Sequence, residues 1–217
     1  RPPSPPGARA VVVFSAAQSY GCLIPAAGLP ARGERRIFGL NGNVAGSGQE
    51  VKLVARTSDT LTFQRSTPSA YSNGPAETLR YRFGLEHIAM SITAQSEQTD
   101  KGMPMEITLG AFERHLTART VLHWSDGDST DFSPAAIGLT YHQYPAHGKP
   151  WKRIQWVAIE QAAPFAAVVL LLEFPPEAEV QAGTHSQLYF KLRVKSGEWV
   201  IAYFLTPEQF AARQGSQ

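Results

Sequence analysis

The chain has 217 residues, of which 43% are hydrophobic and only 18% are charged, and its formal charge is +2. A charge this small, carried by basic residues scattered along the chain, excludes nucleic acid as the expected partner. The single cysteine excludes an intrachain disulfide, and no apolar run reaches the length needed to span a bilayer.

The first residues, RPPSPPG, are rich in proline. Proline favours an extended chain, so residues 1–9 are predicted to be a tether and residues 10–217 to form a single domain. Such a tether fits a mature chain that follows a removed signal peptide, and it also fits a chain joined to an upstream domain. The first alternative predicts an exported protein, periplasmic or extracellular, while a cytoplasmic location stays open.

Alternation of apolar and polar residues is the dominant pattern. In TLRYRFG, residues 78–84, the apolar side chains face one way while Arg80 and Arg82 face the other, and residues 50–56 and 186–194 repeat this alternation. Because a strand sends successive side chains to opposite faces, each segment is expected to bury one face and expose the other. About twelve such strands, separated by turns that contain Gly and Asn, predict an all-β fold. The expected architecture is an antiparallel β-sandwich of the large jelly-roll or supersandwich type.

Two segments, residues 166–174 and 198–205, are apolar on both faces. They are predicted to be central strands that are covered from both sides. Residues 188–205 are predicted to form a hairpin with Ser196 and Gly197 at its tip, because glycine accepts the positive φ that a tight turn requires.

One short helix is expected, at the C-terminus. Thr206 is a suitable N-cap, Pro207 fits the first helical position, and Gln209 stands where a capping box needs it. Gly215 then predicts the end of the helix.

The segment LHWSDGDSTDF, residues 122–132, interrupts the alternating pattern and holds Asp126, Asp128 and Asp131. Ca²⁺ prefers several oxygen ligands, and carboxylates spaced D-x-D-x-x-D around a glycine turn can supply them, so a calcium site is one hypothesis. The segment lacks the glutamate that an EF-hand requires, which excludes that motif. The favoured alternative is a polar hairpin turn whose aspartates bond their own backbone.

The segment TYHQYPAHGKPWKR, residues 140–153, is rich in aromatic residues and has no regular apolar face. Aromatic rings in such a loop stack well on the C–H face of a sugar, while neighbouring polar side chains bind its hydroxyls. A nucleotide is disfavoured because the chain has no glycine-rich phosphate loop. Carbohydrate is therefore the predicted ligand, and the residues predicted to bind it are Tyr141, Tyr144, Trp151, His123 and Trp124. The alternative is a loop that folds over the edge of the sandwich with its aromatic rings half buried.

Acid–base chemistry is a second hypothesis for the same segments. His142 or His147 would act as the base and Asp131 as its partner in hydrolysis, elimination or epimerisation of a sugar. His123 would join the two histidines in a zinc site if the segments are adjacent, although the spacing of the pair is not a familiar ligand spacing. Glu173, which ends the most apolar segment, would be a general acid if buried, but a solvated strand end is favoured.

The alternating strands and aromatic-rich loops resemble the large β-sandwich modules that accompany bacterial polysaccharide-processing enzymes, the galactose-mutarotase-like sandwiches among them. No motif of such a family can be placed on these residues, so the resemblance assigns no catalytic residue. Three functions are compared on this basis: an exported carbohydrate-binding or accessory domain, a sugar-active enzyme, and a structural or interaction domain of a larger protein.

Overall fold

The structure is a computed structural model. It describes residues 10–15, 20–25, 38–39, 51–65, 77–84, 87–94, 105–112, 120–131, 151–161, 169–184 and 188–215. The predicted tether and residues 132–150, which include four of the predicted site residues, lie outside this set.

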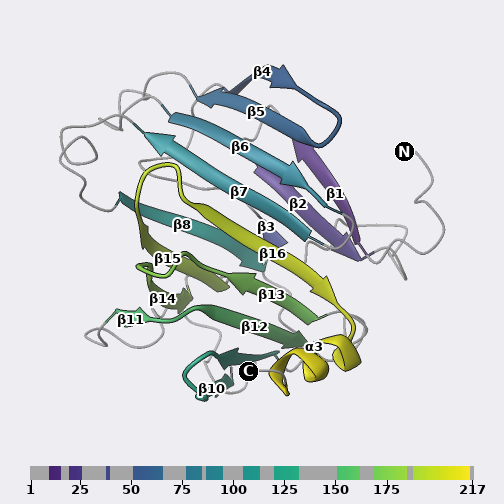
Figure 1. The fold of residues 1–217 in the computed structure, drawn as a ribbon, viewed down its shortest axis with the longest axis vertical. Helices are drawn as coiled ribbons and strands as arrows, with labels where there is room; N and C mark the ends of the chain where they lie inside the picture. Colours follow the sequence, from purple (N-terminus) through teal and green to yellow (C-terminus); the bar gives the residue numbers. More distant parts are fainter. Residues whose placement is uncertain are drawn as a thin grey trace.

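The described residues form sixteen strands, all paired antiparallel, in three sheets (Figure 1). The largest sheet has nine strands, in the order β10 (Ser129–Asp131), β9 (Thr120–Trp124), β12 (Trp156–Gln161), β13 (Val169–Glu173), β16 (Trp199–Leu205), β7 (His87–Ala94), β6 (Glu77–Phe83), β5 (Thr60–Arg65) and β4 (Val51–Arg56). The second sheet has the order β11 (Lys152–Arg153), β14 (Glu179–Thr184), β15 (Leu188–Val194) and β8 (Met105–Phe112). The third contains β1 (Ala10–Ser15), β2 (Tyr20–Pro25) and β3 (Phe38–Gly39), and β3 lies against β8.

One apolar core joins the nine-stranded and four-stranded sheets. Leu122 of β9 and Leu172 of β13 belong to the same buried cluster as Phe190 and Leu192 of β15, and all four side chains are fully buried. Burying a leucine or phenylalanine side chain contributes roughly 1.5–3 kcal/mol, so this shared core is what holds the two sheets together. The predicted all-β antiparallel sandwich is confirmed.

The C-terminal helix α3 (Pro207–Gln214) forms as predicted. The Thr206 hydroxyl oxygen accepts the backbone N–H of Gln209 at 3.2 Å, and the Gln209 side-chain oxygen accepts the backbone N–H of Thr206 at 2.9 Å. This capping box satisfies N–H groups that the first turn would otherwise leave unpaired. In the described part of the chain, no helix is long and apolar enough to cross a bilayer.

Helix α3 lies across the outer face of the nine-stranded sheet, on the side away from the main core. Phe210 is buried there against Trp156, with the two rings 6.0 Å apart and nearly perpendicular. Ala158, Leu171 and Leu205 complete this second apolar cluster. The helix therefore covers the end of the sheet that contains β9, β12 and β13 (Figure 1).

The predicted hairpin over residues 188–205 is wrong in its strand pairing. The tight turn exists, since the Glu198 N–H donates to the Lys195 carbonyl at 3.2 Å and Gly197 has a φ of +86°. However, β15 pairs with β14 and β8, whereas β16 pairs with β13 and β7. The turn thus carries the chain from one sheet to the other, because both strands have apolar faces that bury each other across the core.

The two predicted central strands differ in their burial. Strand β13 is buried on both faces, as expected, except at Glu173. In the adjacent β16 only alternate residues are fully buried up to Phe204, while Trp199, Ile201 and Tyr203 on the other face are partly exposed. The outer face of the sheet is therefore covered at β13 and becomes more accessible from β16 onward.

Strand β4 differs from the prediction that each alternating segment buries one face. Its described side chains, residues 52–56, are all exposed, including 46% of Leu53 and 48% of Val54, so this segment does not bury one face. The strand lies at the edge of the sheet, and its register with β5 shifts between Leu53 and Ala55. Both features remove neighbours that would otherwise cover its side chains.

Candidate functional site

The acidic segment is a tight turn that joins β9 to β10. Asp126 accepts the backbone N–H of Asp128 at 3.1 Å, and the backbone N–H of Trp124 donates to the Asp128 carbonyl at 2.9 Å. Gly127 has a φ of +88°, a conformation that residues with a Cβ rarely adopt. The favoured interpretation of this segment, a polar turn whose aspartate bonds its own backbone, is confirmed.

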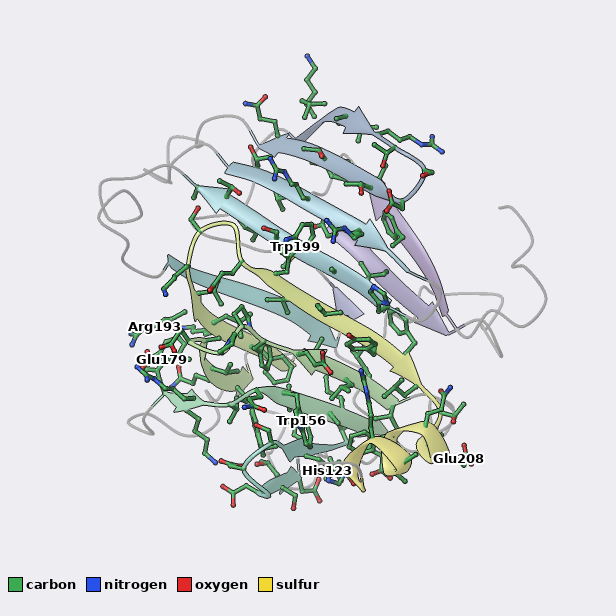
Figure 2. The ribbon with its side chains drawn as sticks, in the orientation of Figure 1. His123, Trp156, Glu179, Arg193, Trp199 and Glu208 are labelled. Carbon is green, nitrogen blue, oxygen red and sulfur yellow. The ribbon has the colours of Figure 1, made fainter. Side chains whose placement is uncertain are left out.

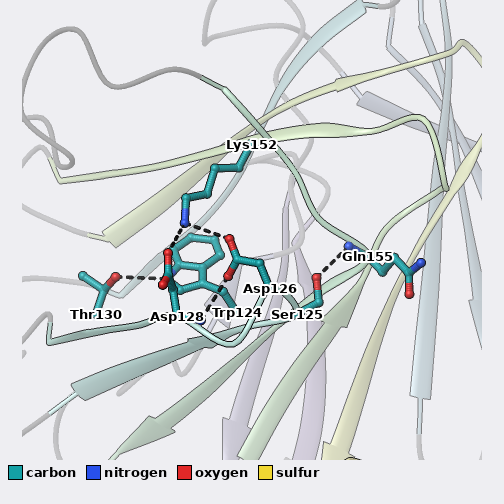
Figure 3. Close-up of polar contacts among 7 residues, drawn as sticks. All are labelled: Trp124, Ser125, Asp126, Asp128, Thr130, Lys152 and Gln155. Atoms are coloured by element: carbon teal, nitrogen blue, oxygen red, sulfur yellow. Dashed lines mark hydrogen bonds and ion pairs between the residues drawn. The ribbon is translucent and has the colours of Figure 1, made fainter. Parts of the chain in front are cut away.

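Lys152 binds this turn from the other sheet (Figure 3). Its ammonium group donates to Asp126 Oδ2 at 2.9 Å and to Asp128 Oδ2 at 2.6 Å. Because Lys152 belongs to β11 and the two aspartates follow β9, the contact joins the edges of the four-stranded and nine-stranded sheets. We call these three residues the lysine bridge.

The charges of the lysine bridge stabilise one another. Partial desolvation raises the pKa of the Asp126 carboxyl, but the hydrogen bond from Lys152, that from the Asp128 N–H and the lysine charge outweigh it, so the pKa lies below the ordinary value of 3.8. The hydrogen bonds to Asp128 and Asp126 raise the pKa of Lys152 above its ordinary value of 10.5. Asp126 and Lys152 are therefore both charged at neutral pH.

His123 and Trp124 point to opposite faces of β9, as successive strand residues must. Trp124 faces the core, where it is only 7% exposed, packs edge-on against Phe190 and donates its indole N–H to Thr130 Oγ1 at 2.9 Å. Its ring offers no open face to a sugar, contrary to the expectation from the sequence. The two residues cannot line one pocket together.

His123 lies on the outer face of the sheet, beside Glu160 of β12. Its Nε2 is 2.8 Å from Glu160 Oε2, and its ring centre is 6.0 Å from that of Phe210 in α3. The sequence predicted neither contact, because the three residues are far apart in the chain. The pairing of β9 with β12 brings His123 beside Glu160, and the packing of α3 on the sheet brings Phe210 beside His123. The imidazole and the carboxylate are within hydrogen-bond distance of each other, and both side chains are partly open to solvent.

The three aspartates do not converge on one point. Asp131 lies at the end of β10, exposed, while Asp126 and Asp128 both bind Lys152. Within the described residues, no three His, Cys, Asp or Glu side chains lie close enough together to hold a metal ion. The calcium site at these aspartates stays a prediction.

Trp151 lies on the four-stranded sheet, immediately before β11. The guanidinium of Arg193, from β15, stacks over its ring at 4.0 Å from the ring centre, and the same group is 3.4 Å from a carboxylate oxygen of Glu179 in β14. Trp151 is partly exposed. Figure 2 shows Arg193 and Glu179 side by side at one margin of the molecule. The arrangement is an aromatic ring beside a fixed pair of opposite charges.

The predicted site residues thus separate into several groups. His123 lies on the outer face of the nine-stranded sheet, and the lysine bridge lies at the edge of that sheet. Trp124 lies in the core, and Trp151 lies on the four-stranded sheet. Tyr141, His142, Tyr144 and His147 lie outside the described residues, so their predicted binding and catalytic roles, and the zinc hypothesis, stay predictions. Asp131 as a catalytic partner also stays a prediction.

Two further groups on the outer face of the nine-stranded sheet were not predicted. Arg82 of β6 stacks over Trp199 of β16, with 4.8 Å from the guanidinium carbon to the ring centre. Glu173, the suspected general acid, is only partly exposed and lies 3.4 Å from Arg213 of α3, so the strand end is neither buried nor fully solvated. The alternation in residues 78–84 did place Arg82 on an outward face, but nothing in the sequence paired it with Trp199.

Comparisons with known proteins find only distant likenesses. No family model and no curated protein match the chain. Among solved structures, a glycoside hydrolase family 81 enzyme from Clostridium thermocellum has a TM-score of 0.43 at 9% identity, over 94% of this chain and 24% of that one. The Slr1438 protein from Synechocystis sp. PCC 6803 has a TM-score of 0.38 at 11% identity, over 72% of this chain and 66% of that one. The chain thus spans about a quarter and about two thirds of these proteins, and scores this low carry no argument about function.

Proposed function

We propose that the protein is an exported carbohydrate-binding or accessory β-sandwich domain, and that Trp151 is the centre of its sugar site. The supporting observation is the group formed by Trp151, Arg193 and Glu179 on the four-stranded sheet. An aromatic ring gives a sugar an apolar surface to pack on, and the paired charges beside it donate to and accept from hydroxyl groups.

The geometry favours binding over catalysis. The Arg193 guanidinium is already held by Glu179 and by the ring of Trp151, so little side-chain freedom is lost when a ligand binds. Glu179 is engaged with a cation, whereas hydrolysis of a glycosidic bond commonly requires two carboxyl groups that act on either side of the bond. These contacts support a site that holds a sugar in place.

The test is binding to a panel of neutral polysaccharides, such as xylan, mannan and mixed-linkage glucan, by affinity electrophoresis and calorimetry. Replacement Trp151→Ala is expected to weaken binding about tenfold, because ring stacking contributes about 1 kcal/mol or more. Trp151→Phe should retain most of the affinity. Trp199→Ala, which removes a partly exposed tryptophan from the other sheet, is the matched control and should bind as the wild type does.

The alternative of a sugar-active enzyme predicts a different ranking of variants. His142→Ala and His147→Ala would abolish release of reducing sugar, whereas a binding domain keeps its affinity in these variants and loses it in Trp151→Ala. No binding to any polymer of the panel, or equal binding by the wild type and a folded Trp151→Ala variant, overturns the proposal.

A further inference from the structure

The outer face of β16, β7, β6, β5 and β4, which we call the open face, carries a polar and basic surface. Strand register places Trp199, Ser91, Arg80 and Thr62 in one row across four adjacent strands. On β6, Arg80 lies between Leu79 and Tyr81, which point into the core and are buried. Because successive residues of a strand point to opposite faces, Arg80 and the rest of the row point outward.

The stacking of Arg82 on Trp199 crosses the intervening strand β7. Arg82 is opposite Ala89, and Trp199 is opposite Ser91. Both side chains on β7 are small and no more than 5% exposed, so the long arginine can extend over them to the indole ring. Stacking uses the flat face of a guanidinium and leaves its N–H groups available at the edges. Arg82 is thereby held in place while it can still bind an anion.

Positive charge predominates on the open face, although the Asp59 carboxylate interacts electrostatically with Arg82. Lys52, Arg80 and Arg82 are exposed, and none of them forms an ion pair with another described residue. The described acidic residue near them is Asp59 in the turn between β4 and β5, whose carboxylate accepts the hydroxyls of Thr57 and Thr60. The face therefore attracts negative charge.

We propose that the open face binds an acidic polysaccharide, one that bears carboxylate or sulfate groups along its length. Neighbouring strands lie about 4.8 Å apart, and Lys52 is opposite Gln64 while Arg80 is opposite Thr62, so the backbones of Lys52 and Arg80 are roughly 12 Å apart. A polymer with repeated anionic groups can pair with both cations and with Arg82. The hydroxyls of Thr60 and Thr62, on the same face between these strands, suit the hydroxyl groups of a sugar.

This surface is separate from the group around Trp151, which lies on the other sheet, so the two proposals fail independently. The test compares polygalacturonate with its fully methyl-esterified form, and dextran sulfate with dextran, by affinity electrophoresis and titration calorimetry on the full chain. Each pair shares one backbone and differs in charge. The wild type is expected to bind the charged member of each pair more tightly than the neutral one. That preference should weaken as salt rises from 50 to 300 mM, because exposed charges are screened.

The double replacement Arg80→Ala and Arg82→Ala should weaken binding of the acidic polymer at least tenfold while neutral polymers bind as before. The matched control is Arg153→Ala with Lys191→Ala, which removes the same charge from the four-stranded sheet and should leave the affinity unchanged. Melting temperatures establish that both variants are folded. Trp199→Phe should keep most of the affinity, since a phenyl ring still supports Arg82.

Three outcomes overturn the inference. One is equal affinity of the wild type and the folded double variant. The second is an equal loss in the control, which would mean that only net charge matters. The third is tighter binding of a single-stranded DNA oligonucleotide than of either acidic polysaccharide, which would assign the face to nucleic acid.

Discussion

The two ends of the nine-stranded sheet differ in what covers their outer faces. At one end Trp156, Ala158 and Leu171 are apolar and lie under α3, and Lys152 joins the neighbouring turn to the second sheet. At the other end the outward residues include Arg80 and Arg82, which are exposed. The inward faces of both ends are alike, since each contributes to the same core. The core thus fixes the sandwich, and the outward residues decide whether an end is covered by α3 or left open.

The largest loss of stability is expected when the contact between α3 and the sheet is removed. Phe210→Ala removes the buried ring that packs on Trp156, and substitutions of this kind destabilise proteins by about 3 kcal/mol or more. Urea unfolding followed by tryptophan fluorescence should show the loss. Arg80→Ala, at the end of the sheet that α3 does not cover, should change the unfolding free energy by less than about 0.5 kcal/mol. Equal destabilisation by the two variants would contradict this expectation.

An intermediate loss of stability is expected when the N-terminal cap of α3 is removed. Thr206→Ala removes the oxygen that accepts the Gln209 N–H, which should destabilise the protein by about 1 kcal/mol without altering the sheet. Thr206→Ser keeps the hydroxyl and serves as the control. The measurement is the urea midpoint at constant slope, and a midpoint for Thr206→Ala that matches the serine variant would show that the cap does not support α3.

The smallest effect is expected from the lysine bridge. Lys152→Met should destabilise the protein by roughly 0.5 kcal/mol at neutral pH, a figure already reduced because the three side chains are partly exposed to solvent. The matched control is Arg153→Met, whose guanidinium lies 3.9 Å from Glu177 and is mostly exposed. The control should change stability less.

The difference in stability between the wild type and Lys152→Met should depend on pH. The pKa of Asp126 is lowered, so its contribution is complete above 3.8 and is lost as pH falls below that value through the folded pKa. The pKa of Lys152 is raised, so its contribution is complete below 10.5 and is lost as pH rises above it. The difference between wild type and Lys152→Met should be largest between about pH 5 and 9, and a difference that grows in acid would contradict the assignment.

Local signals in the sequence predicted local structure well. Thr206, Pro207 and Gln209 defined the start of α3 because a cap depends only on neighbouring residues. Alternation in residues 78–84 identified a strand and its inward face for the same reason. Asp126 and Gly127 likewise indicated a turn.

Signals that depend on strand pairing did not emerge from the sequence. A tight turn between residues 188–194 and 199–205 suggested a hairpin, but a turn does not reveal whether two strands bond to each other or face each other across a core. The contact of Lys152 with Asp126 joins residues in different sheets, and Trp199 meets Arg82 only because β7 lies between their strands. Trp124 was misjudged because a tryptophan next to polar residues can still point inward.

The lysine bridge also bears on how this scaffold can change. Asp128 and Lys152 stand on either side of residues 132–150, and their contact fixes the two points from which that segment departs. Closing a chain between two fixed points costs an entropy that rises slowly with its length, by about 0.6 kcal/mol for each doubling. The contact of Lys152 with Asp128 should therefore tolerate a change in the number of residues that separate the two in the sequence, so the pairing of the two sheet edges is not tied to one chain length.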